Sequence, residues 1–278
     1  MSTKCDKVKT VSQRAAEVPH AHMSLDEVHK YWDSRAAADP SEQATTMDVY
    51  MRAIEWQALE ERIPIDVPLR IADVGCGDAR TTVRLCANRP TSSFAGIDYS
   101  VVMLAVADRV RAEHALSNLE FCQLDVCDGL DRQYDYVITT RCLINIPEWD
   151  LQKKALANIH RALAPGGVFL MIENFVEGHE NMNRVRLKFG LPEIPIRDHN
   201  LFFRRQELLD YVHPLFDVLE EVNISSMYYL VSRVVYSRIC ADAGVTPDYF
   251  NAHHQLAAKL PHCGEFGPVR IMSMKKRQ

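Results

Sequence analysis

The stretch "IADVGCGDA" at residues 71–79 decides how the rest of the chain is interpreted. A short apolar run carries an acid, Asp73, and leads into two glycines, Gly75 and Gly77. A glycine turn at the end of a strand lets a ligand approach the backbone closely, because no Cβ intervenes. The helix that follows offers unpaired N–H groups to that ligand. The stretch therefore predicts a site for a dinucleotide or another adenosine-containing cofactor.

The segments around this turn alternate between short apolar runs and helical patterns. Apolar strands that alternate with helices predict a parallel sheet covered on both faces. Two further strands after residue 210 complete an α/β fold, a Rossmann-like seven-stranded, mostly parallel sheet with helices on both faces. The expected strands are 69–75, 93–98, 119–125, 134–140, 168–174, 215–223 and 268–275, and the expected helices between the first five are 79–89, 100–116 and 149–163.

The chain before the sheet is predicted to form a tail and a helical lid over residues 1–65. Residues 1–22 are polar and aperiodic, so we expect them to be loosely attached. Ser24 begins a helix to about residue 38, and Glu27 completes a capping box. A second helix is expected over residues 45–62, where apolar residues recur at helical spacing.

The rest of the chain, residues 66–278, is predicted to be one cofactor-binding domain that contains two insertions. Residues 176–203 mix prolines, histidines and charges, and are predicted to be a long loop or cap after strand five. The other insertion, 224–266, is expected to begin with a helix to residue 241 and to continue as irregular chain. A short helix is expected between them, over residues 204–212.

Composition excludes several classes of protein. The net charge of −5 and the pI of about 6.1 argue against a nucleic-acid partner, which normally needs a basic face. Eight cysteines without CxxC spacing indicate buried thiols in a reducing compartment and no metal site. The N-terminus lacks the apolar core of a signal peptide and no run of 18 apolar residues occurs, so a cytoplasmic protein without a membrane partner is expected.

Carboxylates end three of the predicted strands. Asp98 ends the second, 21 residues after Gly77, where it could accept both ribose hydroxyl hydrogens. Asp125 ends the third, where it could meet an adenine amino group, and Asp73 precedes the glycine turn. Acids would repel a pyrophosphate but would hold an uncharged ribose and a positively charged methionine group. The charge pattern therefore favours S-adenosylmethionine over NAD as the cofactor.

These features together resemble the class I S-adenosylmethionine-dependent methyltransferases of small molecules. The motifs "IADVGCGDA", "GIDYS", "QLDVCD", "YDYVITTRCLINIP" and "HRALAPGGVFLMIEN" stand in that family's order and spacing, over roughly residues 66–175. Ala79 departs from the pattern, where the family often has a third glycine. The resemblance implies contacts with the methionine end by Asp73, Gly75 and Gly77, with the ribose by Asp98, with adenine by Asp125 and Val126, and with the transferred methyl by Thr140 and Arg141. Tyr99 of "GIDYS" is a further expected cofactor contact.

The resemblance also implies a role for the N-terminal helix. Similar segments in the family fold over the cofactor as a lid, which would bring Tyr31, Trp32 and Arg35 of "YWDSRA" to it. Packing alone explains the tryptophan equally well.

Three residues are candidates for contact with the methyl acceptor. His199 in the cap could take a proton from it near neutral pH, although a hydrogen-bonded structural histidine fits the same pattern. Glu173 ends strand five at the same edge of the sheet. Arg141 could clamp an anionic group of the acceptor, or equally form a salt bridge to a neighbouring helix.

The sequence therefore predicts an enzyme that methylates an O or N atom of a small polar molecule of the sugar or natural-product type. Two alternatives stay open: a nicotinamide-dependent oxidoreductase on a related fold, and a non-catalytic module that binds the cofactor. The methylated atom, the acceptor's identity and the oligomeric state are not indicated.

Overall fold

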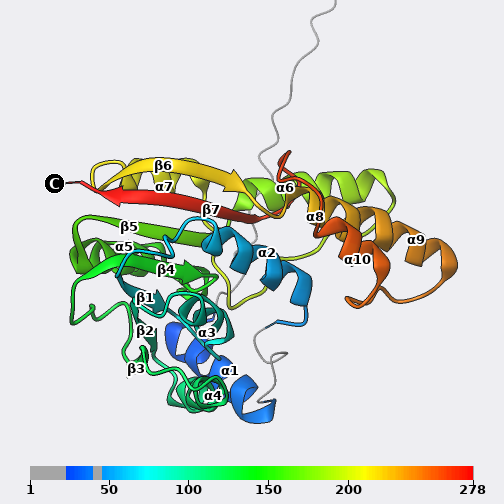
Figure 1. The fold of residues 1–278 in the computed structure, drawn as a ribbon. Helices are drawn as coiled ribbons and strands as arrows, with labels where there is room; N and C mark the ends of the chain where they lie inside the picture. The colour runs from blue at the N-terminus through cyan, green and yellow to red at the C-terminus, as the bar shows by residue number, and fades with distance from the viewer. Residues whose placement is uncertain (1–22, 40–45, 278) are drawn as a thin grey trace, which may run out of the picture.

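A computed structural model describes residues 23–39 and 46–277, and shows one sheet with helices around it (Figure 1). The expectation for residues 1–22 lies outside the described residues. The strands in chain order are β1 (Arg70–Val74), β2 (Ser93–Asp98), β3 (Leu119–Gln123), β4 (Tyr134–Thr140), β5 (Leu163–Asn174), β6 (Phe216–Asn223) and β7 (Val269–Lys276).

The sheet has seven strands in the order β3-β2-β1-β4-β5-β7-β6. The pairs from β3 to β5 are all parallel, and β7 runs antiparallel between β5 and β6. The seven-stranded, mostly parallel sheet predicted from the sequence is confirmed. Its topology places the carboxyl ends of β1, β2, β4 and β5 at one edge, which is where ligands bind in open α/β sheets.

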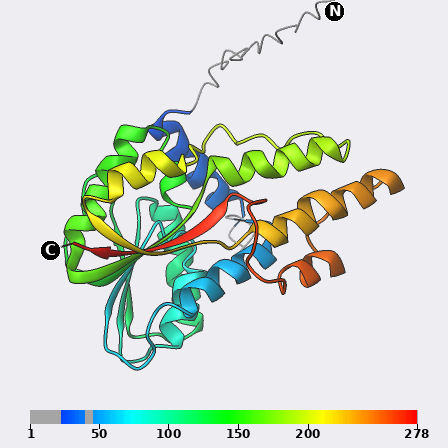
Figure 2. The same cartoon turned by 90° about the horizontal axis from the view of Figure 1, so that it is seen from above.

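Helices cover both faces of this sheet, because successive strand residues point to opposite sides. On one face, α5 (Trp149–Ala162) and α7 (Arg205–Val212) pack on a cluster that includes Val137, Phe169 and Met272. On the other face, α2 (Val49–Glu60), α3 (Arg80–Ala87) and α4 (Val101–Glu113) pack on the neighbouring residues Ile138, Leu170 and Ile271. Figure 2 shows these layers on the two sides of the strands.

The N-terminal helix α1 (Leu25–Ala38) starts as predicted from the sequence. The Ser24 side chain accepts the Glu27 N–H, and the Glu27 carboxylate accepts the Ser24 N–H, so the capping box is complete. The helix packs against α4, beside the carboxyl edge of the sheet. The second predicted helix is α2, whose Asp48 side chain caps its N-terminus.

The cap after β5 differs from the sequence prediction. Residues 176–188 form α6 (Val176–Lys188), where a loop was expected, and only residues 189–203 are irregular apart from the isolated bridge at Phe203. Polar composition concealed this helix, which packs on the later insertion instead of the sheet. That insertion is a long helical run, α8 (Ser226–Tyr229), a π-helical segment (Leu230–Val235) and α9 (Tyr236–Ala243).

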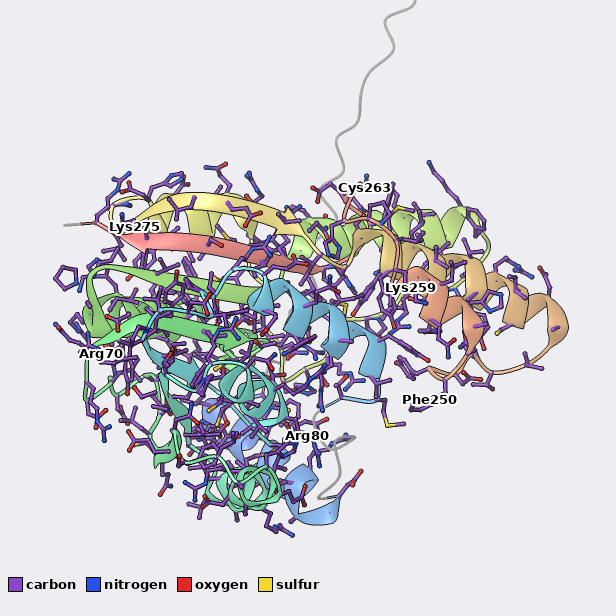
Figure 3. All side chains as sticks on the ribbon, in the orientation of Figure 1. Arg70, Arg80, Phe250, Lys259, Cys263 and Lys275 are labelled. Atoms are coloured by element: carbon purple, nitrogen blue, oxygen red, sulfur yellow. The ribbon has the colours of Figure 1, made fainter. Side chains whose placement is uncertain are left out.

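The long helical run and α6 lie beside one another and project beyond the strand ends (Figures 1 and 2). The part of the insertion expected to be irregular contains one short helix, α10 (Ala252–Ala257). Figure 3 shows Arg80 and Phe250 on this side of the molecule, whereas Arg70 and Lys275 lie at the opposite end of the sheet. Within the described residues, every helix is too short or too polar to cross a membrane.

Candidate active site

The glycine turn after β1 has the geometry that its sequence predicts. Gly75 and Gly77 have φ angles of 72° and 53°, which side chains rarely tolerate. A Cβ built on Gly75 would lie 2.3 Å from the Cys142 sulfur, so the turn after β1 touches the turn after β4. Ala79 takes the left-handed conformation, at φ 54°, where the related family often has glycine, and α3 begins at the next residue.

Two carboxylates beside this turn are almost fully buried. Asp98 accepts the N–H groups of Gly77 and Ser100, each at 2.9 Å, and Asp73 accepts the hydroxyl of Thr82. Burial raises the pKa of Asp73 to about 7 and that of Asp98 to about 6. Within the described part of the chain, no cationic side chain lies at ion-pair distance from either acid.

Asp125 comes to the same edge, from the loop after β3, but is less buried. One of its oxygens accepts the Cys127 N–H at 2.8 Å. With Asp98, Tyr99 and Val126 it lines a narrow cavity of about 50 Å³, whose outer wall comes from α1. The structure thus brings all three carboxylates predicted from strand ends to one place.

A larger cavity of about 440 Å³ adjoins the glycine turn. It is lined by α1 and α2, the turn after β4, the cap and the π-helical insertion. Eleven of the predicted cofactor contacts line one or both cavities: Trp32, Arg35, Asp73, Gly75, Gly77, Asp98, Tyr99, Asp125, Val126, Thr140 and Arg141. The acceptor candidate His199 lines the larger one, and Tyr31 stacks on it with ring centroids 4.4 Å apart.

His199 connects the cap to α1. Its ring packs against the edge of Trp32 as well as the face of Tyr31, and the residue is 6% exposed. Burial and the nearby Arg197 lower the pKa of His199, so the imidazole is neutral at neutral pH. A neutral imidazole in the cavity wall can accept a proton, as a general base requires.

Arg141 follows β4 in a left-handed conformation, with φ 50°, which is uncommon for a residue with a side chain. Its guanidinium pairs with both oxygens of Glu55 from α2, at 2.9 and 3.0 Å. Of the two interpretations that the sequence left open, the salt bridge to a neighbouring helix is the one seen. The pair still lines the larger cavity.

Glu173 has a different environment from the one predicted. It is fully buried and its oxygens accept the N–H groups of Cys142, Leu143 and Ile144 at 2.9–3.2 Å. Its carboxylate therefore holds the turn after β4 in place, and it does not line either cavity. The predicted contact between Glu173 and the methyl acceptor is therefore wrong in this geometry, because β5 directs the side chain toward the turn after β4.

Sequence reasoning missed residues that the structure places at the site. Asn174 ends β5 next to Glu173, lines the larger cavity, and its side-chain oxygen is buried without a hydrogen-bond partner among the described residues. His29 of α1 lines the narrow cavity. A polar residue at a strand end could have signalled Asn174, but nothing in the sequence around His29 indicates its place.

The α2 side of the larger cavity is charged, although its sequence suggested only an apolar stripe. Asp48, Arg52 and Glu55 stand at helical spacing and all line the cavity. Each pairs with an opposite charge from another element, Asp48 with Arg233, Arg52 with Asp78 and Glu55 with Arg141. This wall therefore offers alternating donors and acceptors to a polar molecule.

Comparison with known proteins identifies the domain that carries these features. A family model described as a methyltransferase domain matches residues 65–190. The chain contains a methyltransferase domain at residues 65–190. The methyltransferase domain thus includes β1 to β5 and the whole of α6.

Curated relatives share only part of their length with this chain. A trans-aconitate 2-methyltransferase of Methylobacterium nodulans is 33% identical over 128 residues, which are 45% of this chain and 46% of that protein. A demethylmenaquinone methyltransferase of Staphylococcus carnosus is 35% identical over 104 residues, or 36% of this chain and 41% of that protein. The chain thus spans less than half the length of these relatives.

Solved structures match the fold over most of the chain. The N-methyltransferase NodS of Bradyrhizobium japonicum, in complex with S-adenosylhomocysteine, has a TM-score of 0.56 at 10% identity, covering 90% of this chain and 99% of that chain. The [4+2]-cyclase SpnF has a TM-score of 0.59 at 19% identity, covering 92% and 98%. At these identities the likeness shows the fold alone, and the names attached to it differ in chemistry.

Proposed function

We propose that this protein transfers a methyl group from S-adenosylmethionine to an oxygen or nitrogen atom of a small polar molecule of the sugar or natural-product type. The observation that carries the proposal is the pair of buried carboxylates, Asp73 and Asp98, facing a cavity beside the glycine turn. Desolvated carboxylates are stabilised by hydrogen-bond donors or a cation. Ribose hydroxyls and a positively charged methionine group offer both, so the residues fit this cofactor.

The residues that would hold the cofactor follow the two cavities. Gly75 and Gly77 leave room for the methionine part beside Asp73, and Asp98 would accept the ribose hydroxyls. The base would lie in the narrow cavity, and the lid helix would close over the cofactor. When bound, S-adenosylmethionine supplies an activated methyl group. The remaining proposed contacts are Tyr99, Asp125 and Val126 with the base, Thr140 and Arg141 near the methyl, and Tyr31, Trp32 and Arg35 from α1.

The chain's own contribution is alignment, exclusion of water and removal of a proton. Well-oriented reactants gain up to about 7–11 kcal/mol over free ones. The lid is tied to the turn after β4 by a hydrogen bond of 3.2 Å from Trp32 to Asn145, which encloses the site. His199, neutral and facing the cavity, would take the proton from a hydroxyl or protonated amine, an effect of about 10²–10⁴-fold in rate.

The acceptor would occupy the larger cavity, whose walls suit a small polar molecule. Charged pairs line the α2 side of the cavity. The aromatic rings of Phe202, Tyr229 and Tyr249 line the part of it that is formed by the cap and the insertion. Several matched relatives are named for methylation of trans-aconitate, a small polar compound, and another for demethylmenaquinone. Because these named acceptors differ so much, the choice of acceptor in this protein rests on the lining of its own cavity.

The seven described cysteines are all free thiols. Free thiols persist in reducing compartments. We therefore place the proposed reaction in the cytoplasm.

The proposal is tested by turnover and binding together. Purified protein with S-adenosylmethionine is screened for S-adenosylhomocysteine release against trans-aconitate and pools of sugars, nucleotide-sugars, amines and hydroxy acids. Release that depends on one added compound is the expected result. Titration calorimetry with S-adenosylhomocysteine and NADH separates the alternatives: heat with NADH alone indicates an oxidoreductase, and cofactor binding without turnover of any pool indicates a non-catalytic module.

A further inference from the structure

The lid helix α1 contributes three residues to the wall of the narrow cavity, Leu25, Val28 and His29, and His29 is the one with a polar side chain. Hydrogen bonds from Ser100 to Asp33 and from Trp32 to Asn145 hold the helix over the site. Val28 and Ala36 are the two buried residues of the helix. The His29 side chain is 27% exposed, so most of its surface is covered by neighbouring residues.

The His29 ring stacks on Tyr99, one of the residues at the proposed base site. The ring centroids are 3.8 Å apart and the planes are 18° from parallel, which is close van der Waals contact. The Tyr99 hydroxyl also donates to the His29 carbonyl at 3.4 Å. Tyr99 is therefore held by α1 through both its ring and its hydroxyl.

The same imidazole reaches Asp125. One Asp125 oxygen is taken by the Cys127 N–H at 2.8 Å, and the other lies 3.7 Å from the His29 Nε2 atom. That distance is too long for a hydrogen bond, so the second oxygen keeps its capacity to accept one from a ligand. His29 thus lies beside the Asp125 oxygen that can accept a hydrogen bond from a ligand, and both residues line the narrow cavity.

We propose that His29 is a positioning residue for the nucleoside base, holding Tyr99 and Asp125 so that the cavity selects adenine by its exocyclic amino group. This inference rests on the proposed function, in that S-adenosylmethionine binds with its base in the narrow cavity. Asp125 accepts a hydrogen bond from an amino group, whereas a carbonyl at the same position of the base would face it with like partial charge. Selection is strongest when the carboxylate cannot turn away, and the His29 ring stands beside it, with Nε2 3.7 Å from the second Asp125 oxygen.

The test compares S-adenosylhomocysteine with S-inosylhomocysteine, in which the exocyclic amino group is replaced by a carbonyl and the adjacent N1 carries a hydrogen, by titration calorimetry. Three variants are measured beside the unchanged protein: His29→Ala, His29→Phe and the control Lys30→Ala, which removes an exposed neighbour on the same helix. His29→Ala is expected to weaken S-adenosylhomocysteine binding by about 3- to 10-fold, the range of an aromatic pair. It should also lower the preference for adenine over hypoxanthine at least threefold.

His29→Phe keeps a ring against Tyr99 and should recover most of the affinity, while Lys30→Ala should bind both ligands as the unchanged protein does. The inference is overturned if His29→Ala retains both affinity and preference, or if the preference stays constant while both ligands weaken equally. No heat from the unchanged protein with either ligand would instead refute the proposed function itself. Equal melting temperatures of the variants confirm that the comparison concerns the site and not folding.

Discussion

Adenosine should bind this protein about tenfold more weakly at pH 5 than at pH 8. The reason is Asp98, which burial places at a pKa of about 6 in the free protein. Only the ionised carboxylate can accept both ribose hydroxyl hydrogens while it also accepts the Gly77 and Ser100 N–H groups. With a pKa of about 6, the ionised fraction is roughly 0.1 at pH 5 and nearly 1 at pH 8, and the apparent affinity scales with that fraction.

Adenosine is the suitable probe because it carries no charged group across this range and does not extend to the methionine end. S-adenosylhomocysteine should show a steeper fall, because its amino acid part also meets Asp73, whose pKa burial raises to about 7. Calorimetric titrations at pH 5, 6, 7 and 8 measure both. Asp98→Asn should bind adenosine weakly at every pH, without this slope.

The weaker binding expected at pH 5 cannot be explained by loss of folded protein through protonation of Asp98. The pKa of Asp98 in the folded chain lies above the value of about 3.9 in an unfolded chain, so protonation favours the folded state. The contribution of Asp98 to the free energy of unfolding is therefore largest at low pH and falls as the pH rises from about 4 to 6. Adenosine affinity that is equal at pH 5 and pH 8, or stronger at pH 5, would refute the reasoning.

Three substitutions test the remaining site residues. Asp73→Asn keeps an acceptor for Thr82 and removes a buried charge, so its gain in free energy of unfolding should be larger at pH 8 than at pH 5 by about 2–3 kcal/mol; urea denaturation showing a pH-independent difference would contradict this. Asn174→Leu should leave the melting temperature unchanged or higher, because the side-chain oxygen of Asn174 has no partner in the described fold. The same variant should lower turnover, measured as the rate of S-adenosylhomocysteine formation, at least tenfold; marked destabilisation would show that the amide is structural. His199→Ala should retain S-adenosylhomocysteine affinity and lower turnover at least tenfold; unchanged turnover would remove His199 from the mechanism.

Local patterns were sufficient to predict the sheet and its cofactor edge. A glycine turn, the residues before it and a capping box are each read over fewer than ten positions, and the structure has all three where they were expected. The helix α6 was missed because its sequence is polar. It packs on the π-helical insertion, which lies more than forty residues further along the chain, and such tertiary packing stabilises helices more than local propensity does.

What the sequence by itself determined is the gathering of Asp73, Asp98 and Asp125. Parallel strands present their carboxyl ends at one edge, so any acid at such an end arrives there. What only the tertiary structure decided is which side chains meet across elements. Arg141 pairs with Glu55, 86 residues away, and His29 reaches Tyr99 from a separate helix. Such contacts depend on how helices pack on the sheet, and the spacing of residues along one strand or helix carries no information about them.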